Sequence, residues 1–283
     1  MRRLLLILES IKFEHSIFAL PFAYIGMVLA ARGIPTWDRV FWITLAMVGA
    51  RTLAMAANRL IDAELDALNP RTANRALPRG LLSRRDMVML GFAGLAVLVL
   101  AAWRLNPLCL QLTPVAVAVL IGYSYTKRFT WMSHAILGLA DGMAPVGGWI
   151  AVTGTLDPPA ILLGLAVLFW IAGFDLIYAC QDVEVDRRDG LYSIPACFGI
   201  PFALRLARFC HVLTVLLLVA VGLLAGLGWP YGLGLMVVAA LLVYEHSLVS
   251  PTDLSKVNLA FFTMNGYISI IAFLATALAL WLS

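Results

Sequence analysis

Long apolar runs separated by short polar connectors dominate the chain, and about 20 apolar residues suffice for a helix to cross a bilayer. The runs predict nine membrane-spanning helices. Their ranges are 16–32, 40–58, 87–103, 107–124, 133–152, 159–178, 203–226, 229–247 and 259–281. Turn signals such as Asn106-Pro107 separate several runs, and short connectors favour antiparallel neighbours. We therefore expect an all-α bundle in which residues 1–283 form a single domain. Eight spans with one re-entrant segment are the alternative.

Composition supports a polytopic membrane protein. Hydrophobic residues make up 62% of the 283 residues and charged residues only 13%, against roughly a quarter in a soluble domain. The mean hydropathy of +0.93 excludes a disordered chain, and too few polar residues are present to cover a soluble enzyme. The four cysteines show no CxxC spacing, so we expect buried, unpaired thiols at Cys109, Cys180, Cys197 and Cys210.

The distribution of positive charge predicts the orientation. Residues 1–15 have a basic start and an apolar run that Glu9 and Lys12 interrupt, which is unlike a cleavable signal peptide. Most of the 20 Lys and Arg residues fall in this segment or in the even-numbered connectors, whereas Arg32, Arg39 and Arg104 fall in odd-numbered ones. The positive-inside rule then places the N-terminus in the cytoplasm. We expect a multi-pass protein of the cell inner (plasma) membrane whose active site faces the cytoplasm.

A first acidic cluster follows the second predicted span. Asn58, Asp62 and Asp66 are spaced i, i+4 and i+8, so on a helix they lie on one face. Like charges at this spacing repel each other, and desolvation at a membrane surface adds to the cost. A bound cation relieves both penalties.

A second acidic cluster follows the sixth predicted span, on the same side of the membrane. Asp175, Tyr178, Asp182 and Asp186 step by 3, 4 and 4 residues. Carboxylate and carboxamide oxygens suit Mg²⁺ shared with a phosphate better than they suit zinc. Two other interpretations remain: solvated acids at helix ends, and the intramembrane acids of an ion-coupled transporter.

Basic residues accompany both clusters. Their charges favour a diphosphate whose oxygens bind Mg²⁺ and cationic side chains together. The candidates are Arg51, Arg71, Arg75, Lys127 and Arg128. Arg51 lies inside a predicted span and therefore needs a polar partner. Positive-inside anchoring explains the remaining cytoplasmic arginines, Arg79, Arg84, Arg85, Arg187 and Arg188.

The paired motifs resemble those of a known family. Asn58-x₃-Asp62-x₃-Asp66 and Asp175-x₂-Tyr178-x₃-Asp182-x₃-Asp186 are similar to the two aspartate-rich motifs of the UbiA superfamily of intramembrane prenyltransferases. Tyr125-x-Lys127-Arg128 resembles the phosphate-binding segment of that family, and the match covers residues 12 to 200. The chain looks closest to the 4-hydroxybenzoate polyprenyltransferase branch. It departs from many members at Arg59, where they carry Asp.

The resemblance implies Mg²⁺-dependent transfer of a polyprenyl group from its diphosphate to an aromatic acid, 4-hydroxybenzoate, in quinone biosynthesis. It implies metal ligation by Asn58, Asp62, Asp66, Asp182 and Asp186, with these four acids and Asp175 catalytic. The basic residues named above would bind the diphosphate. The prenyl tail would stay among membrane lipids, and no nucleic acid partner is expected.

The acceptor is left open. Asp175 and Tyr178 are candidates for the acceptor side because they lie one to two turns deeper than Asp182. The candidates for binding the acceptor carboxylate are Lys12, His15 and Arg128. Residues 12–23 and 182–188 also resemble a bacterial sub-branch associated with a naphthoate, so 1,4-dihydroxy-6-naphthoate in a menaquinone route is the alternative. A different class, a non-catalytic binder or transporter of anionic lipids, would need the basic residues but not two acidic motifs.

Overall fold

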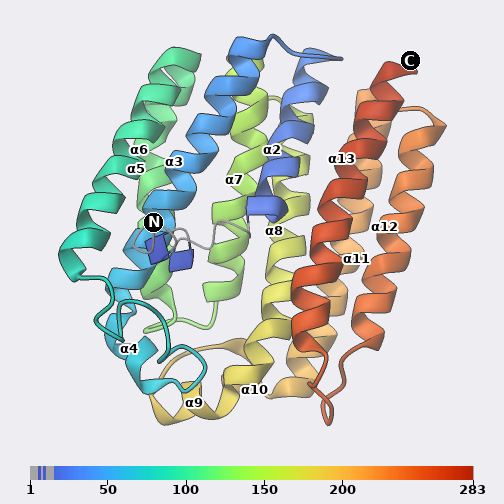
Figure 1. The fold of residues 1–283 in the computed structure, drawn as a ribbon. Helices are drawn as coiled ribbons and strands as arrows, with labels where there is room; N and C mark the ends of the chain where they lie inside the picture. The colour runs from blue at the N-terminus through green and yellow to red at the C-terminus, as the bar shows by residue number, and fades with distance from the viewer. Residues whose placement is uncertain (1–5, 8, 11–15, 283) are drawn as a thin grey trace.

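The computed structural model describes residues 6–7, 9–10 and 16–282, and its regular elements within them are all helical. The long helices form an elongated bundle (Figure 1). They are α2 (Ser16–Ala31), α3 (Trp37–Ile61), α5 (Arg84–Leu105), α6 (Pro107–Thr126), α7 (Ser133–Thr153), α8 (Pro158–Ala179), α11 (Ile200–Ala225), α12 (Trp229–Ser247) and α13 (Asn265–Trp281). A π-helical turn, η3 (Leu259–Met264), leads directly into α13. The all-α expectation is confirmed, and each predicted span overlaps one of these helices.

Seven helical segments in the described part of the chain are long and apolar enough to cross a membrane. The helices α2, with 16 residues, and α12 are not among them. The number of crossings and the side on which the chain starts therefore stay predictions. Large apolar side chains such as Phe92, Leu223 and Val243 point outward and are exposed, as expected of a surface that contacts lipid.

Local sequence explains where these helices begin and end. Asn106 caps α6 by accepting a hydrogen bond from the backbone N–H of Cys109 at 2.9 Å, and Pro107 occupies the first turn. The helix α7 ends at Gly154, whose φ of 74° is left-handed and therefore suits glycine. The predicted turn at Asn106-Pro107 is confirmed.

The helix α7 lies against α2 on one side and α8 on the other. Close approach needs glycine at Gly138 and Gly148, because a Cβ atom would overlap the carbonyl oxygen of Leu168 or Ala23. Gly147, by contrast, has open space around it. The α7 glycines are therefore not equivalent, and only some of them set the helix spacing.

An aromatic centre holds α8 in the middle of the bundle. Trp170 is fully buried, its ring centroid is 4.8 Å from that of Phe22, and its indole N–H donates to Asn265 Oδ1 at 2.7 Å. Cys180 and Cys210 are buried as predicted, but Cys197 is exposed. The expectation of four buried thiols is therefore wrong at Cys197, which lies in the short helix α10 (Ile194–Phe198) at the end of the bundle.

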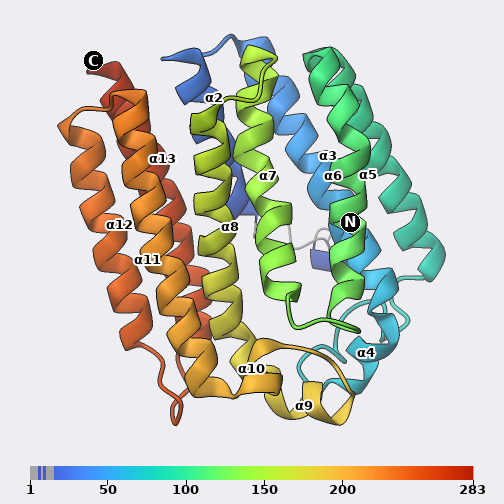
Figure 2. The same cartoon turned by 180° about the vertical axis from the view of Figure 1, so that it is seen from behind.

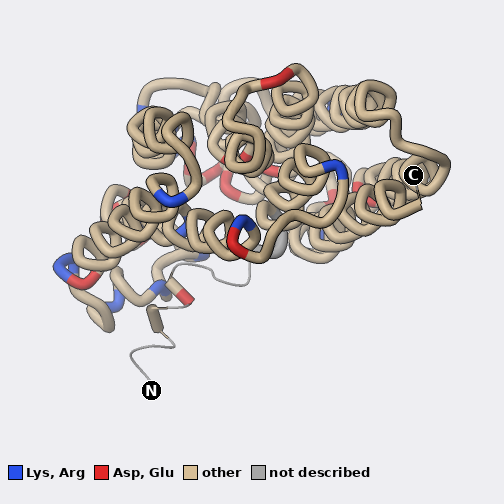
Figure 3. Tube along the Cα trace, turned by 90° about the horizontal axis from the view of Figure 1, so that it is seen from above, with Lys and Arg blue, Asp and Glu red and all other residues tan. Residues whose placement is uncertain are grey.

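Both acidic stretches lie at one end of the bundle. The short helix α4 (Ala63–Leu68) continues from α3, and α9 (Val183–Arg188) continues from α8 through a 3₁₀ turn, η2 (Cys180–Asp182). Figures 1 and 2 show α4, α9 and α10 together at this end, opposite the C-terminus. Viewed along the bundle, most of the chain carries neither sign of charge (Figure 3). Both charged motifs therefore lie at the end of the bundle where α3 and α8 terminate.

Candidate active site

A polar cavity of about 240 Å³ opens between the two acidic stretches. Nine of the predicted site residues line it: Asn58, Asp62, Asp66, Arg71, Arg75, Lys127, Asp175, Asp182 and Asp186. We call this the acidic cavity. The structure therefore brings both motifs and most of the expected cations to one space, although the two motifs are far apart in the sequence.

The first motif does not lie on one unbroken helix. The helix α3 ends at Ile61, and Asp62, with φ −94° and ψ 5°, separates it from α4. The expectation of a single continuous helical face from Asn58 to Asp66 is wrong for this reason. Asp62 and Asp66 still line the same cavity, because α4 begins directly after Asp62 at the end of α3.

Asp62 is buried and joins three groups. Its Oδ2 accepts from Lys127 Nζ at 2.7 Å and from Asn58 Nδ2 at 2.9 Å. Its Oδ1 accepts from Arg128 Nη2 at 3.2 Å. Arg128 does not line the cavity, but it reaches the motif through this contact and through the carbonyl oxygen of Ile61 at 2.7 Å. The segment after α6 thus neutralises the first motif.

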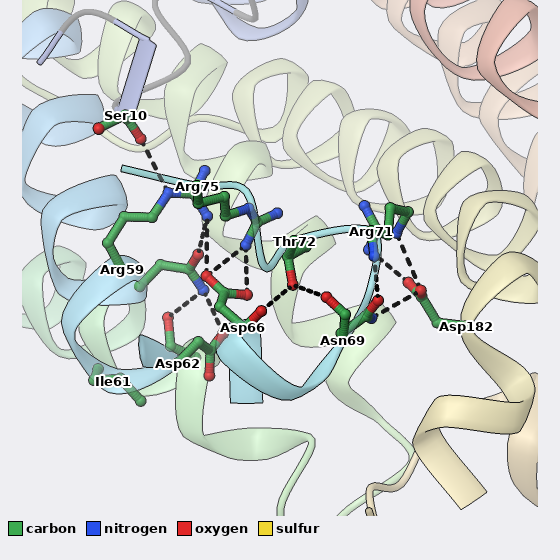
Figure 4. Close-up of polar contacts among 12 residues, drawn as sticks. Ser10, Arg59, Ile61, Asp62, Asp66, Asn69, Arg71, Thr72, Arg75 and Asp182 are labelled. Carbon is green, nitrogen blue, oxygen red and sulfur yellow. Dashed lines mark hydrogen bonds and ion pairs between the residues drawn. The ribbon is translucent and has the colours of Figure 1, made fainter. Parts of the chain in front are cut away.

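Asp66 forms a forked contact with Arg75, whose Nη1 lies 2.6 and 2.7 Å from the two carboxylate oxygens. Arg59, where the resemblance to the family led us to expect Asp, is buried beside the same motif. Its Nη1 donates to Asn58 Oδ1 at 3.2 Å, and its Nε donates to the carbonyl oxygen of Ser10 at 3.1 Å (Figure 4). A cation therefore occupies the place of an acid next to the first motif.

Arg71 links the loop after the first motif to the second motif. Its Nε and Nη2 donate to the two oxygens of Asp182 at 3.1 and 2.6 Å (Figure 4). Its Nη1 donates to Tyr178 Oη at 2.9 Å. Burial lowers the pKa of the Arg71 guanidinium, but the bonds and attraction to Asp182 more than offset this, so its pKa lies above the usual value. Arg71 therefore stays charged.

The remaining acids of the second motif form no salt bridge with Lys or Arg within the described residues. Asp186 Oδ2 accepts from Ser193 Oγ at 2.6 Å. Asp175 Oδ2 lies 2.7 Å from Nδ1 of His134, which begins α7 and also lines the acidic cavity. Sequence reasoning missed His134, Ser193 and Asn69, whose Nδ2 donates to Asp182 at 3.1 Å. Only Asn69 had a signal, its place beside the first motif; the other two reach the cavity through long-range packing.

Arg51 lies elsewhere. It lines a second cavity of about 270 Å³ between α3, α5, α6 and α7, which is largely apolar. Within the described residues, its buried Nε has no hydrogen-bond partner. Arg51 does not line the acidic cavity, so the expectation that it joins the diphosphate-binding cations finds no support in its position. Lys12 and His15, two of the candidates for the acceptor carboxylate, lie outside the described residues.

The acidic cavity has the donor types that Mg²⁺ prefers, carboxylate and carboxamide oxygens. In the described part of the chain, no three His, Cys, Asp or Glu side chains converge as they would around a metal ion. Salt bridges account for this, because Asp62, Asp66 and Asp182 each contact Lys or Arg instead. The residues fit a bound magnesium–diphosphate unit. When it binds, the Lys and Arg side chains would turn from the carboxylate oxygens to the phosphate oxygens.

Comparisons with known proteins agree with the fold. Residues 19–282 match the UbiA prenyltransferase family. A 4-hydroxybenzoate octaprenyltransferase of Nitrosospira multiformis is 33% identical over 85% of this chain and 82% of its own length. The solved structure of a UbiA homolog from Aeropyrum pernix K1 has a TM-score of 0.84 and 34% identity, covering 93% of this chain and 96% of that one.

A second solved structure shares the fold. It is a UbiA homolog from Archaeoglobus fulgidus bound to DMAPP and Mg²⁺, with a TM-score of 0.68 and 21% identity, covering 94% of this chain and 98% of that one. The helical bundle, the paired acidic motifs around one cavity and these matches over nearly the whole chain lead to one conclusion: this multi-pass membrane protein belongs to the UbiA prenyltransferase family and is a prenyltransferase.

Proposed function

We propose that the chain transfers a polyprenyl group from polyprenyl diphosphate to the ring of 4-hydroxybenzoate, in a Mg²⁺-dependent reaction of quinone biosynthesis. One observation carries the proposal: acids of two distant motifs line a single cavity in which Arg and Lys side chains hold them. The relatives' name, 4-hydroxybenzoate octaprenyltransferase, supports the acceptor, and a structural neighbour that binds DMAPP and Mg²⁺ supports the donor class and the metal.

The ligand set follows from the side chains at the cavity wall. Asn58, Asp62 and Asp66 on one side, and Asp182 and Asp186 on the other, would hold Mg²⁺. The ion would neutralise charge that builds up on the departing diphosphate.

The cations of the cavity would bind the diphosphate. Arg71, Arg75 and Lys127 line it, and their side chains are about one-third exposed, so their donors can turn from carboxylate to phosphate oxygens. Arg128 would add positive charge through its contact with Asp62 Oδ1. These donors stabilise the leaving group as the C–O bond breaks towards an allylic cation. Asp175 and Tyr178, deeper along α8, would face the aromatic acceptor.

The orientation belongs to the same proposal. We place the acidic cavity at the cytoplasmic face of the inner membrane, with nine crossings and a single domain, because most Lys and Arg residues lie at or near this end. The apolar prenyl tail would then remain in the hydrocarbon layer while its diphosphate reaches the cavity.

The test uses the purified full-length protein in detergent with a prenyl diphosphate, Mg²⁺ or EDTA, and a panel of aromatic acids. We expect a prenylated product with 4-hydroxybenzoate and none after metal removal. If product formed only with 1,4-dihydroxy-6-naphthoate, that compound would replace 4-hydroxybenzoate as the proposed acceptor, and the Mg²⁺-dependent prenyl transfer would still stand. No Mg²⁺-dependent product with any acceptor would contradict the proposal and favour an anionic-lipid binder or transporter.

A further inference from the structure

The pair formed by His134 and Asp175 differs from the other contacts of the acidic cavity. His134 is the second residue of α7, and its side chain is 5% exposed. Its Nδ1 lies 2.7 Å from Asp175 Oδ2 in the neighbouring helix α8. Both residues line the cavity, so the pair is placed to act on whatever binds there.

The hydrogen bonds identify which ring nitrogen of His134 carries the proton. The backbone N–H of Ile194, in the first turn of α10, points at His134 Nε2 from 3.3 Å. A backbone N–H only donates, so Nε2 must accept with its lone pair. The proton of the neutral imidazole is then on Nδ1 and is donated to Asp175.

This tautomer leaves Asp175 different from the acids that form salt bridges. Asp62, Asp66 and Asp182 contact Arg or Lys, whereas Asp175 is held at one oxygen by the His134 ring N–H, as Asp186 is held at one oxygen by Ser193. Its Oδ1 makes no hydrogen bond within the described residues, and its side chain is 22% exposed. Asp175 therefore presents one oxygen, free to accept a proton, in a fixed direction.

We infer that His134 is a positioning residue that holds the Asp175 carboxylate with Oδ1 directed at the acceptor ring, where it takes the ring proton. This inference rests on the proposed function. The allylic C–O bond breaks and its electron pair leaves with the diphosphate. A ring carbon ortho to the hydroxyl forms the new C–C bond. The C–H proton at that carbon then passes to Asp175 Oδ1, and its electron pair restores the aromatic ring.

Two variants of His134 separate positioning from packing. In His134→Asn the amide nitrogen reaches the place of Nδ1, so the donor to Asp175 is kept. In His134→Gln the amide reaches the place of Nε2, so the partner of Ile194 is kept and the donor to Asp175 is lost. We expect His134→Gln to lower kcat about tenfold, with the KM for prenyl diphosphate unchanged, and His134→Asn to stay within about threefold of the wild type.

A double-variant cycle tests whether His134 acts through Asp175. We expect Asp175→Asn to lower kcat about 100-fold, as for loss of a general base, and His134→Gln to add nothing in that background. Equal damage by the Asn and Gln variants, additive losses in the double variant, or a raised KM for the diphosphate would each overturn the inference. Absence of product from the wild type with every acceptor overturns the proposed function instead, and with it this catalytic role.

A spectroscopic measurement checks the tautomer without any acceptor. In full-length protein labelled with ¹⁵N-histidine, His134 is assigned by loss of its signals in His134→Gln. We expect a protonated Nδ1 and an unprotonated Nε2. The opposite tautomer would overturn the inference even in an active enzyme.

Discussion

Two polar regions of this protein are built on different principles. The acidic cavity carries charged pairs whose basic members are about one-third exposed: Arg71, Arg75 and Lys127. The second region, the Asn265 network, joins Trp170, Glu245 and Asn265 of α8, α12 and α13, and all three side chains are fully buried. Asn265 accepts from Trp170 at 2.7 Å and donates to Glu245 Oε1 at 3.4 Å.

The difference shows which polar groups can change partners. A partly exposed cation that leaves its carboxylate is rehydrated or meets a phosphate oxygen, so the exchange costs little. A fully buried amide has no water to replace a lost partner, and the loss costs its desolvation free energy. The acidic cavity therefore suits the binding and release of a charged ligand, whereas the Asn265 network suits helix packing.

Removing an acid from the cavity should have the largest effect on activity. We expect Asp182→Asn to lower kcat/KM about 1,000-fold, because the metal and diphosphate lose a charged ligand, while the unfolding temperature changes little. Glu64→Gln, at an exposed acid of α4 that pairs with Arg84 on the surface, is the matched control and should remain active. Prenyl-transfer rates and thermal melts in detergent measure both. If Asp182→Asn kept a tenth or more of the wild-type activity, the acidic cavity would not be the site at which the metal and diphosphate bind.

Breaking the buried network should cost stability. Asn265→Leu leaves the indole N–H of Trp170 unpaired and frees the carbonyl oxygens of Ala260 and Phe261, to which Asn265 donates at 3.1 Å. We expect a loss of about 3 kcal/mol, seen as a lower unfolding temperature, with the KM for prenyl diphosphate unchanged. Ser247→Ala, at an exposed position of α12, is the control. Unchanged melting of Asn265→Leu would contradict the structural role of the network.

The contact between α7 and α2 depends on the volume of the side chains at the contact rather than on their polarity. Gly148→Ala places a Cβ atom against the carbonyl oxygen of Ala23, so α7 and α2 must separate. We expect a loss of about 2 kcal/mol. Gly147→Ala, one residue away, meets open space and should change stability by less than about 0.5 kcal/mol. Equal melting temperatures for the two variants would show that α7 does not pack as described.

The smallest effect is expected where one contact of a cation is removed and the rest are kept. Tyr178→Phe deletes the hydroxyl that accepts from Arg71, but Asp182 still holds the guanidinium, and the ring still packs 4.1 Å from Phe261, centroid to centroid. We expect about a fivefold loss in kcat/KM, less than a hydrogen bond from a charged donor contributes by itself, because Asp182 still orients Arg71. A loss as large as that of Asp182→Asn would assign Tyr178 a direct role in the reaction.

Much of the fold could be predicted from the sequence because membrane helices are encoded locally. Apolar runs of suitable length, with Pro107 at a start and Gly154 at an end, identify the helices without knowledge of their neighbours. The spacing of each acidic motif is also local. It selects the motif acids and Asn58, which line the cavity, but it also selects Tyr178, which does not line it. The break at Asp62 escaped prediction, since the pattern alone does not distinguish one helix from two short ones in line.

The sequence by itself determined the helices, the acids and the surplus of cations near them. Only the tertiary structure decided which groups meet: Arg71 with Asp182, His134 with Asp175, and Arg51 with the apolar cavity rather than the acidic one. The reason is physical. Hydropathy and spacing act within a few helical turns, whereas the choice of partner depends on how α3, α7 and α8 pack, and many residues far apart in the chain set that packing together.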